Sequence, residues 1–547
     1  MRILGIGLSH CAGVALIEDG RLVFAQEEDR FSRRRRHKGW PELSLAYLLD
    51  HFDLVEEDID LCVLSDLQTA QKYNAPIRAK RVLTVHHHLA HILSGWALTP
   101  WTDFDAVSID GGGDFGSWQS FGRVRNRRLE FWESNCGSYL NGEKGVSRSW
   151  LKRSPARTFG AYWSVPAVLN FGMLDKGGVG GYEGKLMGLA GHGDRARFKP
   201  KEAMYDGSFS VKHKGDLHWL TTHGYPKIGD NHYVITPDGQ RLTLAQVRDL
   251  RKKKHEIISE YDLNNPRDLQ FAADFASHLQ SMTDKAIGEL FEWNFSDKTP
   301  IVVSGGTFGN VVLNGKLNER YDLFVTPPMG DEGLALGAAA WGAYLTGARE
   351  VDIPGYYLGY NAGQNKDVDV DEVAQLLNSD KVIGLVEGAM EFGPRALGAR
   401  SILASPRDAA ANLSINERLG RVEYMPFAPV ILEEEADKVL KGWSKTHVSA
   451  SHMTLVYPVQ EEWKDCLRGV VHVDGTVRPQ VLSRLDNPVY YDILQAFFRL
   501  TGIPVLINTS FNVHGEPIVR TIDQAIAALE TGRIDALVAG NQLHRRC

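Results

Sequence analysis

The sequence predicts an α/β fold in which a duplicated, two-lobed N-terminal region is followed by a separate C-terminal α/β domain. The chain opens with three short apolar runs separated by turns, "RILGIGLSHCAGVALIEDGRLVFAQEEDRF". A similar triplet follows about a hundred residues later, "FDAVSIDGGGDFGSWQSFGRVRNRRLEFWES". Short apolar runs punctuated by glycine and acidic turns are typical of strands joined by hairpins. Two such triplets therefore indicate a duplicated α/β body.

The remaining segments fit the same architecture. Residues 265–295 carry apolar side chains at helical spacing and lead into the predicted strand "PIVVSGG". Residues 333–347, "GLALGAAAWGAYLTG", are a predicted small-residue helix that can pack closely against its neighbours. Between residues 355 and 370 the periodicity is lost, and a new strand, "KVIGLVEG", then begins. The sequence therefore predicts two domains, residues 1–355 and 370–547.

The composition is that of an ordered globular protein without a nucleic-acid surface. Hydrophobic residues make up 43% and charged residues 24% of the 547 residues, and the formal net charge is −7. A negative net charge provides no footprint for DNA or RNA. The five cysteines are never spaced as C-x-x-C, which argues against a disulfide framework or a zinc–cysteine site. Since neither a signal sequence nor a membrane-length apolar stretch is evident, we expect a cytoplasmic protein.

Four histidines lie within six positions of the run "VHHHLAHIL" at residues 85–93. In a helix, His87 and His91 share a face because they are four apart, whereas His86 and His88 point elsewhere. Two imidazoles are too few to hold a divalent ion at a catalytic site, so carboxylates would have to come from other segments. Taken alone, the run favours a packed histidine cluster, with half of a metal site as the alternative.

Two aspartates and a double glycine occupy positions that often face clefts. Asp110 ends the predicted strand "AVSID", and Asp331 begins the "DEG" ahead of the small-residue helix. Both are candidate ligands, although a turn or N-cap aspartate is the more common explanation for either one. Gly305 and Gly306 in "VVSGGTFGN" allow the backbone to approach a phosphate or ribose, and Asn310 can cap a helix or touch the ligand.

An arginine-containing motif, "MEFGPRALGARSILASP", is the strongest indication of an anion site. It places Arg395 and Arg400 around a Gly-Pro break, with Ser401 directly after them. Guanidinium groups suit phosphate oxygens, so a positioned anion site is favoured over a surface arginine pair. The segments "HVDGTVRPQ" and "INTSFNVHGEPI" have the composition of ligand-binding loops. The basic run "RFSRRRRHKGW" is expected to be a solvated loop, with a grip on an anionic ligand left open.

In this order, the motifs resemble those of the ATP-dependent O-carbamoyltransferases of nodulation and antibiotic tailoring, the tobramycin, novobiocin and cephamycin carbamoyltransferase type. The matching segments, which span nearly the whole chain, are "LGIGLSHCAGVALIEDGRLVFAQEEDRFSR", "HHLAH", "SIDGGGD", "GKLMGLAGHG", "SGGTFGNVVLNGKL", "GDEGLALGAA", "EFGPRALGARSIL", "EYMPFAP", "HVDGTVRPQ" and "NTSFNVHGEPI". The resemblance implies an actin-like (ASKHA) N-terminal domain and a YrdC-like C-terminal domain. The latter would form carbamoyladenylate from Mg-ATP and carbamoyl phosphate, and the former would pass the carbamoyl group to a hydroxyl of a small-molecule natural product.

The resemblance also implies roles for individual residues. The metal ligands would be His87, His91, Asp110 and Asp331, with iron as the expected ion and magnesium or manganese as alternatives. His10 would be the base for the acceptor hydroxyl, or else a buried structural histidine. The adenylate contacts in the N-terminal domain would be Gly111, Gly112, Lys185, Gly188, Gly305, Gly306 and Asn310. The contacts to ATP and carbamoyl phosphate in the C-terminal domain would be Arg395, Arg400, Ser401, Arg421, Arg478, Asn508, Ser510 and Asn512.

The chain departs from the family pattern in "NERLGRVEYMPFAP". Many relatives carry a lysine–arginine pattern before "PFAP", so Arg421 stands here as the substitute for the family lysine. The acceptor is open among aminoglycosides, macrolactams, sugars and cephems.

Three other functions fit the residues less well. An actin-like small-molecule kinase generally needs an acidic residue in the first hairpin, which here reads "GIGLSH". A tRNA carbamoyl-type modification enzyme is disfavoured because the chain lacks a basic surface. A non-catalytic ATP-binding scaffold would not need both the His/Asp set and the arginine motif.

Overall fold

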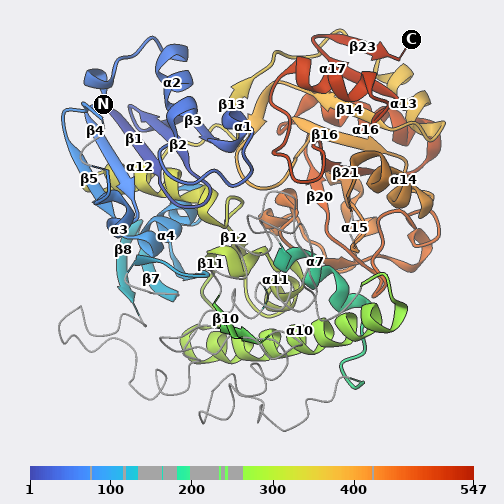
Figure 1. Ribbon diagram of the computed structural model, residues 1–547, viewed down its shortest axis with the longest axis horizontal. Coiled ribbons are helices and arrows are strands. Elements are labelled where there is room, and N and C mark those ends of the chain that lie inside the picture. Colours follow the sequence, from blue (N-terminus) through green and yellow to red (C-terminus); the bar gives the residue numbers. More distant parts are fainter. Residues whose placement is uncertain are drawn as a thin grey trace. The chain divides into compact units, whose positions relative to one another are not determined.

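The computed structural model describes residues 1–73, 77–114, 119–133, 163, 182–197, 233–235, 241–243, 263–421 and 424–546 (Figure 1). The chain forms two compact units. One comprises Met1–Gly137 together with Ser296–Cys547, and the other comprises Ser138–Phe295. Among the helices of the described residues, none is both long and apolar enough to cross a bilayer.

The chain begins with a five-stranded sheet in the order β3-β2-β1-β4-β5. Its strands are β1 (Arg2–Gly7), β2 (Gly13–Glu18), β3 (Arg21–Glu27), β4 (Leu61–Ser65) and β5 (Val82–Val85). The first three are antiparallel, and β4 and β5 continue the sheet parallel to β1. Asp19 and Gly20 both have positive φ in the β2–β3 turn, as a type I′ hairpin requires. The predicted opening strand triplet is therefore confirmed.

A second five-stranded sheet has the order β12-β11-β6-β7-β8. It contains β6 (Phe104–Ile109), β7 (Gln119–Arg125), β8 (Arg128–Glu133), β11 (Ile301–Ser304) and β12 (Leu323–Val325). Again three antiparallel strands are followed by two strands parallel to the first of them. The two sheets thus share one pattern of strand order and pairing, which agrees with the two triplets in the sequence. Their assignment to an actin-like fold stays a prediction.

Helices of the first unit pack against these sheets. They are α1 (Asp29–Ser32), α2 (Glu42–His51), α3 (Leu67–Ala70), α4 (His87–Leu98), α11 (Val311–Asn318) and α12 (Leu334–Leu345). Helix α12 is the predicted small-residue helix, and Figure 1 shows it beside β1 and α4. A Cβ at Gly337 would lie 1.8 Å from the carbonyl oxygen of Ala90, and one at Gly5 would lie 2.0 Å from that of Ala335. Glycine at these contacts therefore lets α12 lie directly on α4 and β1.

The C-terminal part has its own seven-stranded sheet, in the order β20-β17-β21-β16-β14-β22-β23. These strands are β14 (Ile383–Val386), β16 (Arg400–Ala404), β17 (Ala428–Leu432), β20 (Gln480–Leu482), β21 (Val505–Ser510), β22 (Ala536–Ala539) and β23 (Gln542–Arg545). Two small sheets pair β13 (Tyr357–Asn361) with β15 (Ala389–Glu391) and β18 (Tyr457–Pro458) with β19 (Thr476–Val477). The helices are α13 (Val370–Asn378), α14 (Ala410–Leu419), α15 (Ala436–Val439), α16 (Pro488–Thr501) and α17 (Ile522–Glu530). The YrdC-like assignment and the domain limits stay predictions.

The second unit contains the long helix α10 (Pro266–Asn294), which confirms the helix predicted over residues 265–295. It starts with Asn265, whose side chain accepts the N–H of Arg267, and with a proline in the first turn. Its other described elements are α7 (Tyr182–Leu189), β9 (Tyr233–Ile235) and β10 (Arg241–Thr243). The division into two domains that the sequence indicates does not anticipate this separate unit.

Candidate functional site

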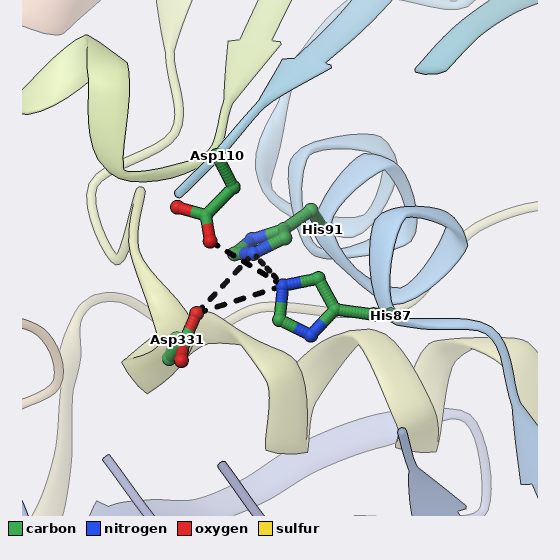
Figure 2. A group of neighbouring side chains, drawn as sticks. All are labelled: His87, His91, Asp110 and Asp331. Atoms are coloured by element: carbon green, nitrogen blue, oxygen red, sulfur yellow. Dashed lines mark hydrogen bonds and ion pairs between the residues drawn. The ribbon is translucent and has the colours of Figure 1, made fainter. Parts of the chain in front are cut away.

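Four side chains from distant parts of the sequence converge in the first unit (Figure 2). His87 and His91 lie one turn apart on α4, Asp110 follows β6, and Asp331 begins the turn that leads into α12. The Nε2 atoms of the two histidines are 3.2 Å apart, and His87 Nε2 is 3.6 Å from Asp110 Oδ2. Asp331 Oδ1 lies 3.7 Å from His87 Nε2 and 3.6 Å from His91 Nε2. Two ligands of one transition-metal ion lie roughly 3.0–3.4 Å apart, so these atoms are close to a coordinating arrangement.

Residues behind the cluster hold its members in place. His87 Nδ1 is paired with Asp66 Oδ1 at 2.8 Å, which leaves Nε2 facing the other three side chains. The Asp114 carboxylate accepts the backbone N–H of His87 at 2.9 Å, and Ser9 Oγ donates to Asp331 Oδ2 at 2.5 Å. None of these three was predicted from the sequence. Asp66 follows a buried strand just as Asp110 does, so a search for aspartates at strand ends would have found it.

Burial makes the protonation states of the cluster depend on its internal pairing. Burial by itself lowers the pKa of His87, but its pairing with the Asp110 and Asp66 carboxylates outweighs this and raises that pKa well above its usual value. Burial and repulsion by Asp331 both raise the pKa of Asp110, yet the two histidines hold it at about 2. The pKa of Asp331 is likewise held well below its usual range, against burial, by its pairing with the His91 imidazole. Both carboxylates are therefore ionised and available to a cation.

The other histidines of the run have different roles. His86 is the N-cap of α4, where its Nδ1 accepts the N–H of His88. His88 pairs with Ser108 Oγ at 2.9 Å, and burial together with the neighbouring imidazoles lowers its pKa well below the usual value. His87 and His91 are therefore the two histidines that lie where the metal-site alternative needs them, which stays a prediction, whereas His86 and His88 contact other groups of the fold.

His10 lies at the edge of this cluster. Its side chain is 54% exposed, and its Nδ1 is 3.4 Å from Asp331 Oδ2. Ser9 Oγ, which donates to Asp331, is 3.2 Å from the same ring nitrogen. His10 is thus not a buried structural histidine, and it lies where a molecule at the cluster could reach it.

The glycine turns divide into two kinds. The N–H of Gly306 donates to Asp110 Oδ1 at 2.6 Å, so that turn holds a cluster side chain. Gly305 has φ +94°, and a Cβ there would lie 2.3 Å from the Ile109 carbonyl oxygen. Gly111 and Gly112, in contrast, have open space where a Cβ would be. Asn310 caps α11 through the N–H of Leu313, and Lys185 and Gly188 lie on α7 of the second unit.

In the C-terminal part, three of the predicted anion-binding residues meet. The Arg421 guanidinium donates to Ser510 Oγ at 3.2 Å, to Asn512 Oδ1 at 2.5 Å and to Thr509 Oγ1 at 3.0 Å. Arg421 is half-buried two residues after the end of α14, and its three polar partners come from the end of β21 and the loop that follows it. Arg421 also donates to the carbonyl oxygens of Ser510 and Asn512 at 2.7 Å each, so its interpretation as a substitute cation stays a prediction.

The two arginines of "GPRALGAR" are not equivalent. Arg395 is half-buried, whereas Arg400 begins β16 and is fully buried. The Arg400 guanidinium donates to backbone carbonyls, those of Tyr360, Glu387, Gly388, Ala399 and Arg520. The hydrogen-bond donors of Arg400 are thus satisfied inside the fold, which favours a supporting role over direct contact with an anion.

The other predicted residues of this region also divide into buried and accessible ones. Ser401 Oγ accepts the N–H of Gly398 at 3.0 Å, and Asn508 Nδ2 donates to Gln480 Oε1 at 2.7 Å. Both Ser401 and Asn508 are buried, while Arg478 is half-buried. Ser401 and Asn508 therefore support the arginine motif from within the fold.

The prediction of a solvated basic loop is wrong for two of its arginines. Arg30 is only 6% exposed and pairs with Asp29 at 2.5 Å. Arg33 donates to the carbonyl oxygens of Ile518 and Pro517 at 2.6 and 2.8 Å. Positive charge in a sequence usually indicates solvent exposure, but here neighbouring carboxylates and carbonyls satisfy it inside the fold.

Comparison with known proteins connects both sites to one family. Residues 2–77 and 73–340 match the family model described as "Carbamoyltransferase N-terminus", and residues 374–546 match "Carbamoyltransferase C-terminus". The chain belongs to the carbamoyltransferase family. The two matches include the His–Asp cluster and the arginine motif, and the resemblance carried by the motifs is confirmed.

Full-length relatives of this carbamoyltransferase chain come from archaea and rhizobia. It is 30% identical to an uncharacterised protein of Methanocaldococcus jannaschii, covering 99% of both chains. It is 29% identical to the nodulation protein NolNO of Sinorhizobium fredii, covering 98% of this chain and 79% of that one. Among solved structures, HypF of T. kodakarensis is 14% identical, with 64% of this chain and 49% of that chain covered and a TM-score of 0.30. That overlap is too small to assign a fold.

Proposed function

We propose that this carbamoyltransferase works in two steps at two sites. In residues 370–547, carbamoyl phosphate, one water molecule and Mg-ATP would give carbamoyladenylate, with phosphate and pyrophosphate as the other products. In residues 1–355, the carbamoyl group would then pass to a hydroxyl of a small-molecule natural product. The observation that carries the proposal is the convergence of His87, His91, Asp110 and Asp331 in the N-terminal region, away in sequence from the arginine motif. Neither nucleic acid nor a membrane is part of the proposed reaction.

The donor set of the cluster fits a divalent transition-metal ion. Two imidazole nitrogens with two carboxylates suit iron, manganese or zinc better than magnesium or calcium, which prefer oxygen ligands alone. We take iron as the expected ion and manganese as the first alternative, while magnesium, the other alternative, fits these nitrogen donors less well. Held by these four residues, the ion would supply positive charge beside the phosphate of the adenylate.

His10 and the open glycines would act on the reacting molecules. One ring nitrogen of His10 would accept the proton of the acceptor hydroxyl. The hydroxyl oxygen would at the same time attack the carbamoyl carbon, and AMP would leave. The N–H groups of Gly111 and Gly112 are better placed for the adenylate than that of Gly306, which already donates to Asp110. Gly305 and Asn310 complete the proposed adenylate contacts of the first unit, and the roles expected for Lys185 and Gly188, on α7 of the second unit, stay predictions from the sequence.

At the other site, arginine side chains would neutralise phosphate groups. Arg395, Arg421 and Arg478 are half-buried, and Ser510 and Asn512 lie against Arg421. Arg400, Ser401 and Asn508 would support this surface through the backbone. Because carbamoyl phosphate and the adenylate are both labile in water, we expect the intermediate to pass from one domain to the other without release.

The deciding assay incubates the purified full-length protein with Mg-ATP, carbamoyl phosphate and Fe²⁺ or Mn²⁺. We expect pyrophosphate release that requires carbamoyl phosphate. We also expect mass spectrometry to detect carbamoyladenylate. Boiled protein and the Arg421→Ala variant serve as controls. Absence of pyrophosphate above the boiled control would refute the proposal.

Release of ADP that requires an added hydroxyl compound but no carbamoyl phosphate would instead identify a kinase. A panel of hydroxylated natural products then narrows the acceptor.

A further inference from the structure

Residues 26–33, which we call the linking segment, connect the N-terminal sheet to three places in the C-terminal part of the same unit. Gln26 Oε1 accepts the N–H of Tyr360 at 2.9 Å. Arg33 donates to the carbonyl oxygens of Pro517 and Ile518. Between these two contacts, Glu27 and Arg30 reach Gly393 in the "GPRALGAR" motif. The segment therefore touches the loops on which the proposed anion site depends.

The contact at Gly393 holds both polar groups of one residue. Its N–H donates to Glu27 Oε1 at 2.9 Å, and its carbonyl oxygen accepts from Arg30 Nη2 at 3.1 Å. Glu27 is 3% and Arg30 is 6% exposed, and Asp29 pairs with Arg30 from the other side. Hydrogen bonds in a water-excluded place are stronger than surface ones, and the Arg30 guanidinium adds its charge to the bond with the carbonyl oxygen of Gly393. Gly393 is thus fixed by side chains that belong to the N-terminal sheet.

The position of Gly393 affects the arginine two residues later. Gly393 has φ +121°, and Pro394, whose own φ is restricted by its ring, leads directly to Arg395. After Arg395, the loop is fixed from within the C-terminal part, where Glu391 Oε1 accepts the N–H of Leu397 at 2.7 Å. Before Arg395, Glu27 and Arg30 hold the loop at Gly393. The direction in which Arg395 leaves the backbone therefore depends on both holds.

The linking segment also supports the turn that carries His10. The N–H of Glu28 donates to the carbonyl oxygen of Ala12 at 2.7 Å, and Glu27 pairs with Gly13 in the β2–β3 ladder. Ser9, in the same turn, donates to Asp331 of the His–Asp cluster. One short stretch of chain thus contacts the backbone beside both proposed sites.

We propose that Glu27 and Arg30 are positioning residues, which hold Gly393 so that Arg395 presents its guanidinium to a phosphate group of the substrate. This role rests on the proposed function, in which Arg395 binds carbamoyl phosphate or ATP. Neither Glu27 nor Arg30 touches the reacting atoms, and both act through the Gly393–Pro394 backbone. The basic run thereby contributes to anion binding indirectly, through the shape of the arginine motif.

The first test needs no turnover. Hydrogen–deuterium exchange of the full-length protein is followed in peptides that cover residues 392–397. In Glu27→Ala the Gly393 amide should exchange at least about tenfold faster than in wild type, because it loses its hydrogen-bond acceptor. Glu27→Gln keeps an acceptor oxygen and should stay within about twofold of wild type. If the alanine variant does not fold, Glu27→Leu fills the same space without an acceptor.

A matched control comes from the same sheet. Glu18 pairs with Arg2 at 2.7 Å within the N-terminal sheet, so Glu18→Ala should leave the exchange of residues 392–397 unchanged. Unchanged exchange in both Glu27→Ala and Glu27→Leu would overturn the proposed hold on Gly393. Equal acceleration in Glu18→Ala would overturn it as well, because it would indicate general loosening of the sheet.

The second test asks whether Glu27 acts through Arg395. KM values for carbamoyl phosphate and for ATP are measured from pyrophosphate release in Glu27→Ala, Arg395→Ala and the double variant. The KM for the substrate that Arg395 binds should rise at least about fivefold in each single variant, and the double variant should be no worse than Arg395→Ala. Losses that multiply would refute the positioning role. Wild-type protein that releases no pyrophosphate would refute the proposed function alone, since the exchange experiment still judges the hold on Gly393.

Discussion

The His–Asp cluster and the arginine motif are organised in opposite ways. In the cluster, side chains from distant segments direct one atom each toward a common point, and others hold them from behind, as Asp66 holds His87. In the arginine motif, residues that are neighbours in sequence separate in space. Arg400 turns into the fold and binds carbonyls, while Arg395 stays half-buried. The same short motif therefore supplies both a structural arginine and a candidate ligand arginine.

This difference follows from the side chains themselves. Aspartate and histidine are short, so the backbone largely decides what they can reach, and a strand end or a helix face already aims them. Arginine is long and carries five donors, so it can satisfy backbone carbonyls as well as a phosphate. Residue type is thus a better guide to a metal cluster than to an anion site. Variants at the two sites can test this contrast directly.

The largest effect is expected at the cluster. His87→Ala combined with His91→Ala should lower the affinity for a divalent metal by more than about 100-fold, because even loss of an outer partner typically costs 10–100-fold. Metal content by plasma mass spectrometry and affinity by titration measure this. Pyrophosphate release from ATP and carbamoyl phosphate should be largely retained. His51→Ala, at an exposed position on α2, is the control. Equal loss of metal binding and pyrophosphate release would contradict two separate sites.

Much of the fold was predictable because its signals are local. The opening strand triplet, α10 and α12 follow from apolar spacing, glycine turns and small residues within short windows. The separate unit of residues 138–295 and the order of the seven-stranded sheet were not predicted. Both depend on pairing between segments far apart in sequence, and periodicity within one segment does not encode its partner.

The site was predictable to a similar limit. The sequence could nominate His87, His91, Asp110 and Asp331 by type and by placement at element ends, and the structure brings them together. It could not separate Arg395 from Arg400, because that depends on the pairing of β16 with β14, which places Arg400 opposite Val386 inside the sheet. Binding of metal and substrates by these residues stays a prediction.

The next largest effect distinguishes the two kinds of arginine by stability. Arg400→Ala should lower the free energy of unfolding by about 3 kcal/mol or more, because several buried carbonyls lose their donor together. Arg421→Ala, at a half-buried position, should lower the free energy of unfolding by less than about 1.5 kcal/mol. It should lower pyrophosphate release more strongly than Arg400→Ala does. Urea denaturation measures both. A stable Arg400→Ala protein with impaired substrate binding would reverse the roles assigned to these arginines.

A smaller effect is expected behind the cluster. Asp66→Asn keeps the shape of the side chain but removes the carboxylate that orients His87, so metal affinity should fall by about 10–100-fold. Titration of the metal-free protein with Fe²⁺ or Mn²⁺ measures the change. Asp60→Asn is the matched control, since Asp60 pairs with Lys80 away from the cluster. Unaltered metal affinity in Asp66→Asn would mean that the Asp66 carboxylate does not orient His87 for metal binding.

The smallest effect concerns a histidine outside either site. Burial of His452 lowers its pKa to about 3, so the folded protein keeps this imidazole neutral while the unfolded chain protonates it below about pH 6.5. The unfolded state then binds more protons, and stability falls as the pH drops through 6.5 toward 3. Between pH 7.5 and 5.5 this residue should account for about 1.4 kcal/mol of lost stability, measured by urea denaturation. His452→Gln should lack that loss, whereas substitution of the exposed His51 by Gln should retain it. The same pH dependence in His452→Gln as in wild type would show that a different buried group is responsible, and His472, whose pKa burial lowers to about 4, is the next to substitute.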